Sequence, residues 1–247
     1  MDKLRSFFIW IFNIAFGIIM FPVTFLVWFI LYPFDRRRVV THWLLVFQSI
    51  IISWLIQLRK IQIEGREKAQ KETAYVIISN HQSIIDILII NCLRYRYRWI
   101  SKIENLRVPL LGWYIRMADY IVVDRGNKES KSEMMEKSAE NIRNGISIMI
   151  FPEGTRSTDK EIGLFKQGAF QLALMTDKSI LPILIDGTGE LLPKHGLVFS
   201  HGSRLRIKVL DPVHPGTFGT GNPEELAGKF RDLMIDELKK MREKIQD

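Results

Sequence analysis

Two long stretches without charged residues dominate the N-terminal part of the chain. The first, residues 7–34, contains 28 residues and no Asp, Glu, Lys or Arg, and the second, Val39–Leu58, contains 20. An apolar run of about 18–20 residues is long enough to form a membrane helix. The first run is too long for a cleavable signal peptide. The pattern therefore predicts two apolar helices joined by a short basic segment.

The basic residues that flank these helices bear on how they meet a membrane. They form three patches: Lys3/Arg5, Arg36–Arg38 and Arg59/Lys60. Such residues favour the cytoplasmic side, so two full crossings would leave one patch on the wrong side. Pro22 can also bend the first helix, because it lacks a backbone donor. We therefore favour a membrane-embedded helical hairpin that enters one leaflet and returns, over two true spans or a buried soluble helix pair.

From about residue 61 onward, short β-rich runs alternate with helical stretches. Strands are predicted at Ala74–Ser79, Tyr97–Ser101, Tyr120–Asp124, Ile146–Phe151, Ile180–Ile185 and Leu205–Leu210. Helices are predicted at Ser83–Leu93, Leu110–Ala118, Lys128–Asn144, Leu164–Thr176 and, with an apolar stripe that extends to Ile245, from Pro223 onward. This alternation predicts an α/β fold with a mostly parallel or mixed sheet flanked by helices. We expect residues 1–60 to form the hairpin and residues 61–247 the α/β domain.

Charge and cysteine content narrow the function classes. A net charge of +8 suits either nucleic acid or anionic lipid as a partner. With two lipid-length runs and no nucleic-acid motif, anionic membrane lipid is favoured and no nucleic acid is expected. The single cysteine, Cys92, excludes an intrachain disulfide and a Cys-based zinc cluster. The five histidines show no ligand spacing, so we expect no metal.

His81 and Asp86 follow the first predicted strand of the α/β domain. A neutral imidazole can take a proton from a hydroxyl, and a carboxylate on its other nitrogen would fix the tautomer. If a helix starts near Ser83, the Asp86 side chain can fold back to reach the imidazole. The spacing alone is weak, because five histidines make such a pair common by chance, and a structural capping pair is the alternative.

A second polar group, Phe151-Pro-Glu-Gly-Thr-Arg-Ser157, follows another predicted strand. Gly154 permits unusual backbone angles, and the Arg156 guanidinium can bind phosphate through two parallel hydrogen bonds. Glu153 can accept from a glycerol hydroxyl or hold Arg156, and Arg125, at another strand end, offers a second guanidinium. A solvated turn with local ion pairs is the alternative. Because ligands of such folds bind at the carboxyl ends of strands, both polar groups can share one cleft.

These motifs resemble those of the glycerolipid acyltransferase family, and most closely those of the bacterial 1-acyl-sn-glycerol-3-phosphate acyltransferases. The resemblance runs from about residue 60 to residue 215. In chain order, the matching segments are Asn80–Asp86, Ser101–Glu104, Ile121–Arg125, Phe151–Ser157, Phe165–Gly168 and Ile180–Leu184. The chain departs from the family pattern at Asp119, where family members often carry glycine. That departure concerns the local loop shape and fine acceptor selectivity.

The resemblance implies transfer of a fatty acyl group from acyl-CoA or acyl-carrier protein to the sn-2 hydroxyl of lysophosphatidic acid. The product would be phosphatidic acid, made for phospholipid biosynthesis at the cytoplasmic face of the bacterial inner membrane. His81 would be the general base and Asp86 would orient it. A thioester is already activated, so no cofactor is expected. Substrate-binding residues would be Lys102, Arg125, Glu153, Gly154, Thr155 and Arg156.

Three other functions stay open. The same chemistry could act on another acceptor, either glycerol-3-phosphate or a different lyso-lipid. A membrane-bound lipid hydrolase could use His81 to activate water, although the chain has no serine-nucleophile elbow. A non-catalytic anionic-lipid binder would keep the hairpin and the basic charge, but it has no need for an imidazole beside a carboxylate.

Overall fold

The computed structural model of the protein describes residues 2–56, 61–70 and 72–243. Within them, seven strands form one sheet in the order β1-β7-β6-β2-β5-β3-β4. Neighbouring strands are parallel except β6 and β7, which are antiparallel. The predicted α/β class with a mostly parallel or mixed sheet is confirmed. The strands are β1 (Gln62–Glu64), β2 (Val76–Ser79), β3 (Tyr97–Lys102), β4 (Ile121–Val123), β5 (Ser147–Ile150), β6 (Ile180–Asp186) and β7 (Arg206–Val209).

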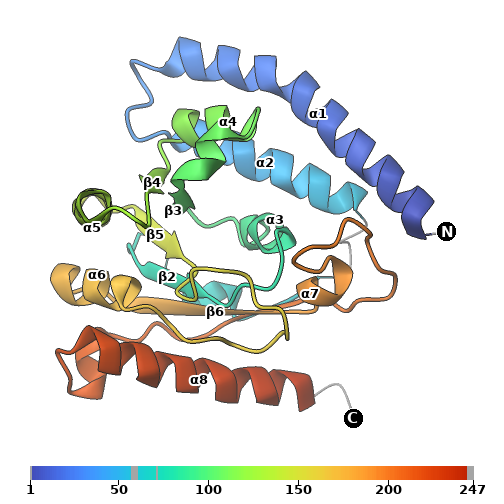
Figure 1. Cartoon of the computed structure of the whole chain (residues 1–247). Coiled ribbons are helices and arrows are strands. Elements are labelled where there is room, and N and C mark those ends of the chain that lie inside the picture. Colours follow the sequence, from blue (N-terminus) through green and yellow to red (C-terminus); the bar gives the residue numbers. More distant parts are fainter. Residues whose placement is uncertain (1, 57–60, 71, 244–247) are drawn as a thin grey trace.

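Helices cover both faces of the sheet (Figure 1). Successive side chains of a strand point to opposite faces, and in β2 both faces are buried. Val76 and Ile78 join the core beneath α5, α6 and α8, whereas Ile77 joins the core shared with α3 and the N-terminal helices. The helices are α1 (Asp2–Leu31), α2 (Val39–Leu55), α3 (Ile85–Asn91), α4 (Leu111–Met117), α5 (Lys128–Arg143), α6 (Gly168–Thr176), α7 (Thr188–Leu191) and α8 (Pro223–Glu243), with short 3-10 helices η2 (Arg66–Lys68), η3 (Ile103–Arg107) and η4 (Pro215–Phe218).

Several short elements and one helix start differ from the sequence prediction. Helix α6 begins at Gly168 rather than at Leu164, because the chain before it is held in another conformation by the Lys166 N–H, which donates to the Pro152 carbonyl (2.9 Å). The apolar side chain of Leu164 is 82% exposed there. Strand β1 and helix α7 were not predicted, because each is only three or four residues long and lacks a periodic pattern.

The predicted pair of apolar N-terminal helices is present. Helix α1 has 30 residues and is long and apolar enough to cross a membrane, by length and composition, whereas α2 has only 17. At 1.5 Å per residue α2 is about 26 Å long, less than the roughly 30 Å of a hydrocarbon core. Four features of the prediction lie outside the described residues: the end of the second apolar run, the Arg59/Lys60 patch, the boundary at residue 60, and Ile245.

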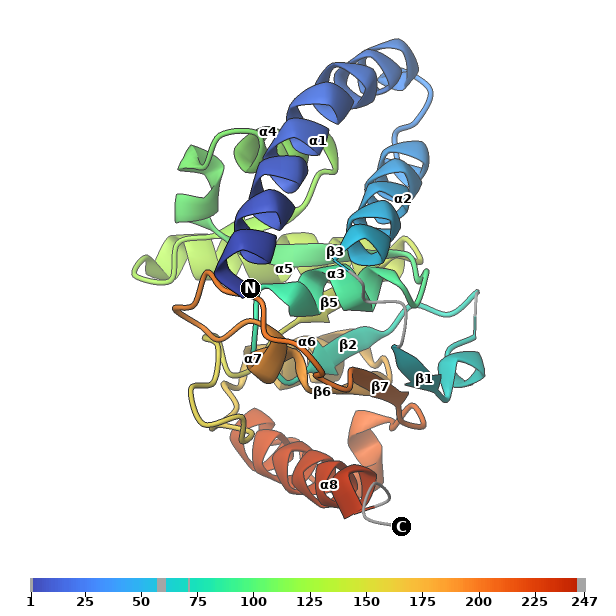
Figure 2. The ribbon, with the colours of Figure 1, turned by 90° about the vertical axis from the view of Figure 1, so that its right-hand side faces the viewer.

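The hairpin lies along the side of the sheet opposite α8 (Figures 1 and 2). Near its N-terminus, the Ser6 hydroxyl accepts a hydrogen bond from the Phe199 N–H (2.8 Å). At the turn between the helices, the buried Arg98 guanidinium in β3 donates to the Arg37 carbonyl (2.8 Å). The start of α1 and the α1–α2 turn are therefore both fastened to the α/β domain.

Candidate active site

The site lies where β2 and its parallel neighbour β5 end. The His81 ring, just after β2, stacks on the Phe151 ring, just after β5, with centroids 3.8 Å apart and planes 9° apart. On the other side of β2, the Asn80 amide exchanges two 2.8 Å hydrogen bonds with the backbone of Ile185 in β6. The prediction that the two motifs share one place at the carboxyl ends of the strands is confirmed.

The structure brings His81 and Asp86 into direct contact. Nδ1 of His81 lies 2.7 Å from Oδ2 of Asp86, whose side chain is fully buried. The same oxygen accepts from the backbone N–H groups of Gln82 (2.7 Å) and Ser83 (2.9 Å). Because a carboxylate only accepts, Nδ1 is the protonated nitrogen. In the described part of the chain Nε2 has no hydrogen-bond partner, and the side chain is 16% exposed, so Nε2 can accept a proton.

Asp86 has one further partner, which sequence reasoning missed. The Thr188 hydroxyl in α7 donates to Oδ1 of Asp86 at 2.5 Å. Nothing in the sequence marks Thr188, since it lies outside every recognised motif and about a hundred residues from Asp86. The segment that contains α7 is also tied to the loop after β2, because the Ser83 hydroxyl donates to the Leu192 carbonyl (2.6 Å).

Glu153 holds the backbone of His81. Its carboxylate is buried and accepts from the His81 N–H (2.8 Å) and the Gly163 N–H (3.1 Å). Burial raises the pKa of Glu153 above its ordinary value, and these two hydrogen bonds oppose the shift. The sequence suggested that Glu153 meets a substrate hydroxyl or Arg156. In the structure the carboxylate binds these two backbone N–H groups, as a buried carboxylate needs donors close by, and among the described residues it makes no ion pair with Arg156.

The turn at Gly154 gathers positive charge. Gly154 has φ +69°, the unusual backbone angle that the sequence led us to expect. Arg125 donates to its carbonyl oxygen, and a Cβ added to Gly154 would lie 2.9 Å from the Lys166 ammonium. Arg156, two residues along the same turn, has no ion pair with any described acidic residue. Two cations, Arg125 and Lys166, therefore lie beside this turn and Arg156 follows it in the sequence, an arrangement suited to an anion such as phosphate.

Two other predicted site residues, Lys102 and Thr155, have exposed or half-exposed side chains. Lys102, at the carboxyl end of β3, pairs with Glu104 at 2.7 Å, and both side chains are about half exposed. The Thr155 side chain is exposed. Among the described residues, no hydrogen bond or ion pair joins either side chain to the other predicted site residues.

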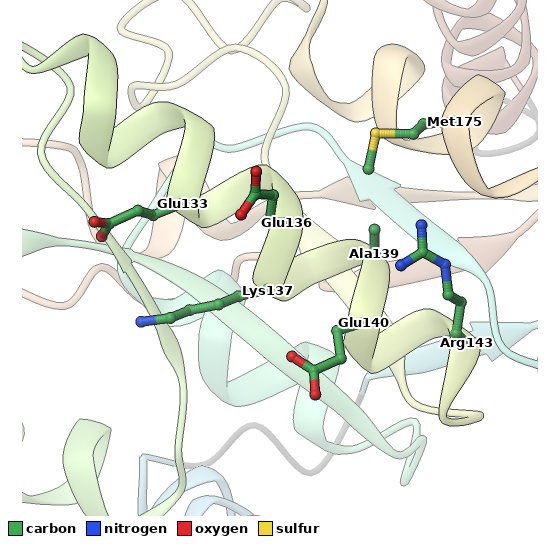
Figure 3. Close-up of a pocket in the computed structure, with 7 residues that line it drawn as sticks. All are labelled: Glu133, Glu136, Lys137, Ala139, Glu140, Arg143 and Met175. Atoms are coloured by element: carbon green, nitrogen blue, oxygen red, sulfur yellow. The ribbon is translucent and has the colours of Figure 1, made fainter.

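A surface groove of about 460 Å³ runs along α5 and contains none of the predicted site residues (Figure 3). Its charged groups do not converge, since Lys137 and Arg143 lie at opposite ends. Within residues 2–56, 61–70 and 72–243, no three His, Cys, Asp or Glu side chains are grouped so that they could hold a metal ion. The groove is lined by Glu133, Glu136, Lys137, Ala139, Glu140, Arg143 and Met175.

A protein-family model described as Acyltransferase matches residues 60–186, more than half of the chain. The chain belongs to the acyltransferase family. The matched region contains the loop from His81 to Asp86, the Gly154 turn, and the strands that position both. The candidate site at the carboxyl ends of β2 and β5 thus lies within the region that matches the family.

Named relatives are similar to this chain in sequence. A chloroplastic 1-acyl-sn-glycerol-3-phosphate acyltransferase of Arabidopsis thaliana is 35% identical over 63% of this chain and 44% of its own length. A chloroplastic one of Brassica napus is 32% identical over 83% of this chain and 56% of its own. The chain thus spans about half the length of these relatives. The crystal structure of the LPA acyltransferase PlsC from Thermotoga maritima shares the fold, with a TM-score of 0.79, 23% identity and 98% coverage of both chains.

Proposed function

We propose that this acyltransferase moves a fatty acyl group from a thioester to the sn-2 hydroxyl of lysophosphatidic acid, giving phosphatidic acid. One observation carries the proposal: the His81 imidazole, whose Nε2 has no hydrogen-bond partner among the described residues and whose Nδ1 contacts a buried carboxylate, lies beside a turn that two cations approach. The first group suits removal of a proton from a hydroxyl, and the second suits a phosphate. The names of the relatives, which are 1-acyl-sn-glycerol-3-phosphate acyltransferases, support this acceptor.

In this mechanism His81 acts as a general base. Nε2 takes the proton of the sn-2 hydroxyl while the hydroxyl oxygen attacks the thioester carbonyl carbon. The carbon–sulfur bond then breaks, and the imidazolium returns the proton to the departing sulfur as a thiol. The Asp86 carboxylate stabilises the imidazolium and keeps Nε2 pointed at the acceptor. The donor thioester, from acyl-CoA or acyl-carrier protein, is already activated, so the scheme needs no cofactor.

The cations of the Gly154 turn would hold the acceptor phosphate. Arg125 and Arg156 are suited to bind its oxygens, with the turn at Gly154 and Thr155 letting the phosphate approach the backbone. Lys102 would have to leave its exposed ion pair with Glu104 to join them, which costs little at a solvated site. We assign Glu153 the task of holding the His81 backbone.

The hairpin would bring this site to a lipid acceptor. Most large apolar side chains of α1 are exposed, among them Phe8 (60%), Ile19 (66%) and Phe29 (64%). Because α1 is fastened near its start and at the α1–α2 turn to the α/β domain, we propose that the hairpin lies in one leaflet. The nearby arginines would then meet anionic headgroups at the cytoplasmic face, and water-soluble donors would arrive from the aqueous side.

The test uses purified protein in nanodiscs with lysophosphatidic acid and a labelled acyl-CoA, or acyl-carrier protein as the donor. Wild type is expected to form phosphatidic acid, and His81→Ala is expected to be about 10²–10⁴-fold slower, the usual contribution of a general base. If product formed only with glycerol-3-phosphate or another lyso-lipid, that compound would be the acceptor in place of lysophosphatidic acid. No transfer to any of these acceptors, with liposome binding intact, would support a lipid-binding protein instead.

Arg156→Ala separates the acceptor site from the donor site. We expect a higher KM for lysophosphatidic acid and a nearly unchanged KM for the thioester, because Arg156 lies on the Gly154 turn. Arg143→Ala, an exposed arginine on α5, is the matched control and should change neither value. A large rise in the thioester KM would move Arg156 to the donor site.

A further inference from the structure

The Asp86 carboxylate is held by two parts of the chain that are far apart in sequence. Oδ2 is bound locally, by His81 Nδ1 and the N–H groups of Gln82 and Ser83. Oδ1 accepts one hydrogen bond among the described residues, from the Thr188 hydroxyl in α7. Asp86 and Thr188 are both fully buried, so bulk water does not reach either end of this contact.

The sheet places Thr188 at this position. Strand β6 lies next to β2, with Ser79 opposite Ile183, so the chain leaving β6 emerges beside the loop that carries His81 and Asp86. Gly187 then turns the chain with φ +90°, and a Cβ on it would overlap the Arg204 carbonyl oxygen. The first residue of α7 is thereby directed back over the end of β2.

The Thr188 hydroxyl has one hydrogen and two neighbouring acceptors. Oδ1 of Asp86 lies at 2.5 Å, whereas Oε1 of Gln82 lies at 3.5 Å. The Gln82 oxygen also faces the Gly189 N–H at 3.4 Å. Since the ionised oxygen is nearer and is the stronger acceptor, the hydrogen goes to Asp86.

We infer that Thr188 is a positioning residue for the His81–Asp86 pair, an inference that rests on the proposed acyl transfer. Its hydroxyl holds Oδ1 and so keeps Oδ2 facing Nδ1 of His81. It also supplies a hydrogen-bond donor to the Asp86 carboxylate, and bulk water cannot replace this donor because the contact is buried. Among the described residues the Thr188 hydroxyl forms no hydrogen bond with Arg125 or the Gly154 turn, so its effect should fall on kcat and not on the acceptor KM.

The experiment compares two substitutions that differ in one hydroxyl. Thr188→Val keeps the shape and removes the donor, and we expect kcat to fall about ten- to hundredfold, the usual effect of losing a hydrogen bond to a buried charge. Thr188→Ser keeps the donor and should stay within about threefold of wild type, a difference of well under 1 kcal/mol. Thr188→Ala replaces the valine variant if the latter does not fold.

A cycle with Asp86 distinguishes positioning from a general structural role. Thr188→Val should lower kcat in the wild-type background and have almost no further effect in an Asp86→Ala background, because it acts through Asp86. Equal fractional losses in both backgrounds would overturn the inference, as would a serine variant as slow as valine. If the wild type transfers acyl groups and Thr188→Val is equally active, the positioning role of Thr188 is wrong but the proposed function stands. If the wild type itself is inactive, the proposed function is wrong.

The thermal unfolding midpoints of the same four proteins test the contact without any assay of transfer. Thr188→Val should lower the midpoint more in the wild-type background than in Asp86→Ala. Equal lowering in both backgrounds would mean that the hydroxyl and the carboxylate are not coupled, and it would refute the inference even if no acyl transfer were found.

Discussion

Replacing Asp86 by Asn removes one charge from the site and keeps most of its hydrogen bonds. The Asn carbonyl oxygen can take the place of Oδ2 and accept from His81 and from the N–H groups of Gln82 and Ser83. The new NH₂ group then faces the Thr188 hydroxyl, which can rotate to accept from it. We therefore expect the folded structure and the His81 tautomer to survive the substitution.

The loss of activity should come from the missing charge. During the reaction the imidazolium faces Asp86 across the 2.7 Å contact between Nδ1 and Oδ2. With both charges delocalised, their centres lie about 4 Å apart, and at an effective dielectric constant of about 20 the attraction is about 4 kcal/mol. Asp86→Asn should therefore lower kcat about 10³-fold. The acceptor KM should change little, because the Gly154 turn is untouched.

Initial rates of thiol release from an acyl thioester, with lysophosphatidic acid as acceptor, measure this effect directly. Asp211→Asn is the matched control, because the Asp211 side chain is 79% exposed and, within the described part of the chain, forms an ion pair with Lys68 alone. A kcat for Asp86→Asn within tenfold of wild type would refute the reasoning. It would mean that no imidazolium beside Asp86 is stabilised in the rate-limiting step.

Two further predictions concern the Gly154 turn and the C-terminal helix. Gly154→Ala and Gly145→Ala both place a side chain at positive φ (+69° and +77°), so each should destabilise the fold by about 1 kcal/mol. Only Gly154→Ala should raise the KM for lysophosphatidic acid, since Gly145 has nothing within 4 Å of an added Cβ. Equal KM values for the two variants would mean that the Gly154 turn does not bind the acceptor. Hydrogen bonds from Lys208 and Lys240 lower the pKa of Glu237 to about 2. The ionised Glu237 therefore stabilises the fold above about pH 4.5, and this contribution is lost as the pH falls towards 2. Glu237→Gln should lower the free energy of unfolding by up to about 3 kcal/mol at pH 7 and by much less at pH 3. Urea unfolding at both pH values measures the difference.

Local features of the site could be predicted from the sequence, and long-range ones could not. His81 and Asp86 are five residues apart, so one turn of chain decides whether they meet. The contact of Thr188 with Asp86 depends on β6 lying next to β2, and the order of strands is not encoded in a periodic pattern. The motif indicated that Glu153 belongs to the site. It could not show which donors surround a buried carboxylate, so its contact with the His81 backbone had to come from the structure.

For the fold as well, local features could be predicted from the sequence and long-range ones could not. Strands buried on both faces, such as β2, are continuous apolar runs that the sequence shows clearly. Strand β1 has three exposed residues and exists because it pairs with β7, a contact that no local pattern indicates. The prediction that α6 begins at Leu164 was wrong because apolar character alone does not make a helix start, and the chain there is held by a hydrogen bond to Pro152.

The contact between the Ser6 hydroxyl and the Phe199 N–H joins residues 193 positions apart. The hairpin precedes this docking partner in the chain, so it leaves the ribosome well before Phe199 does. Contacts of such sequence separation form slowly, because a long loop must close before they stabilise anything. The apolar helices are therefore made well before the contact that fastens them to the α/β domain can form. Folding of this protein thus also depends on the order in which its parts are made.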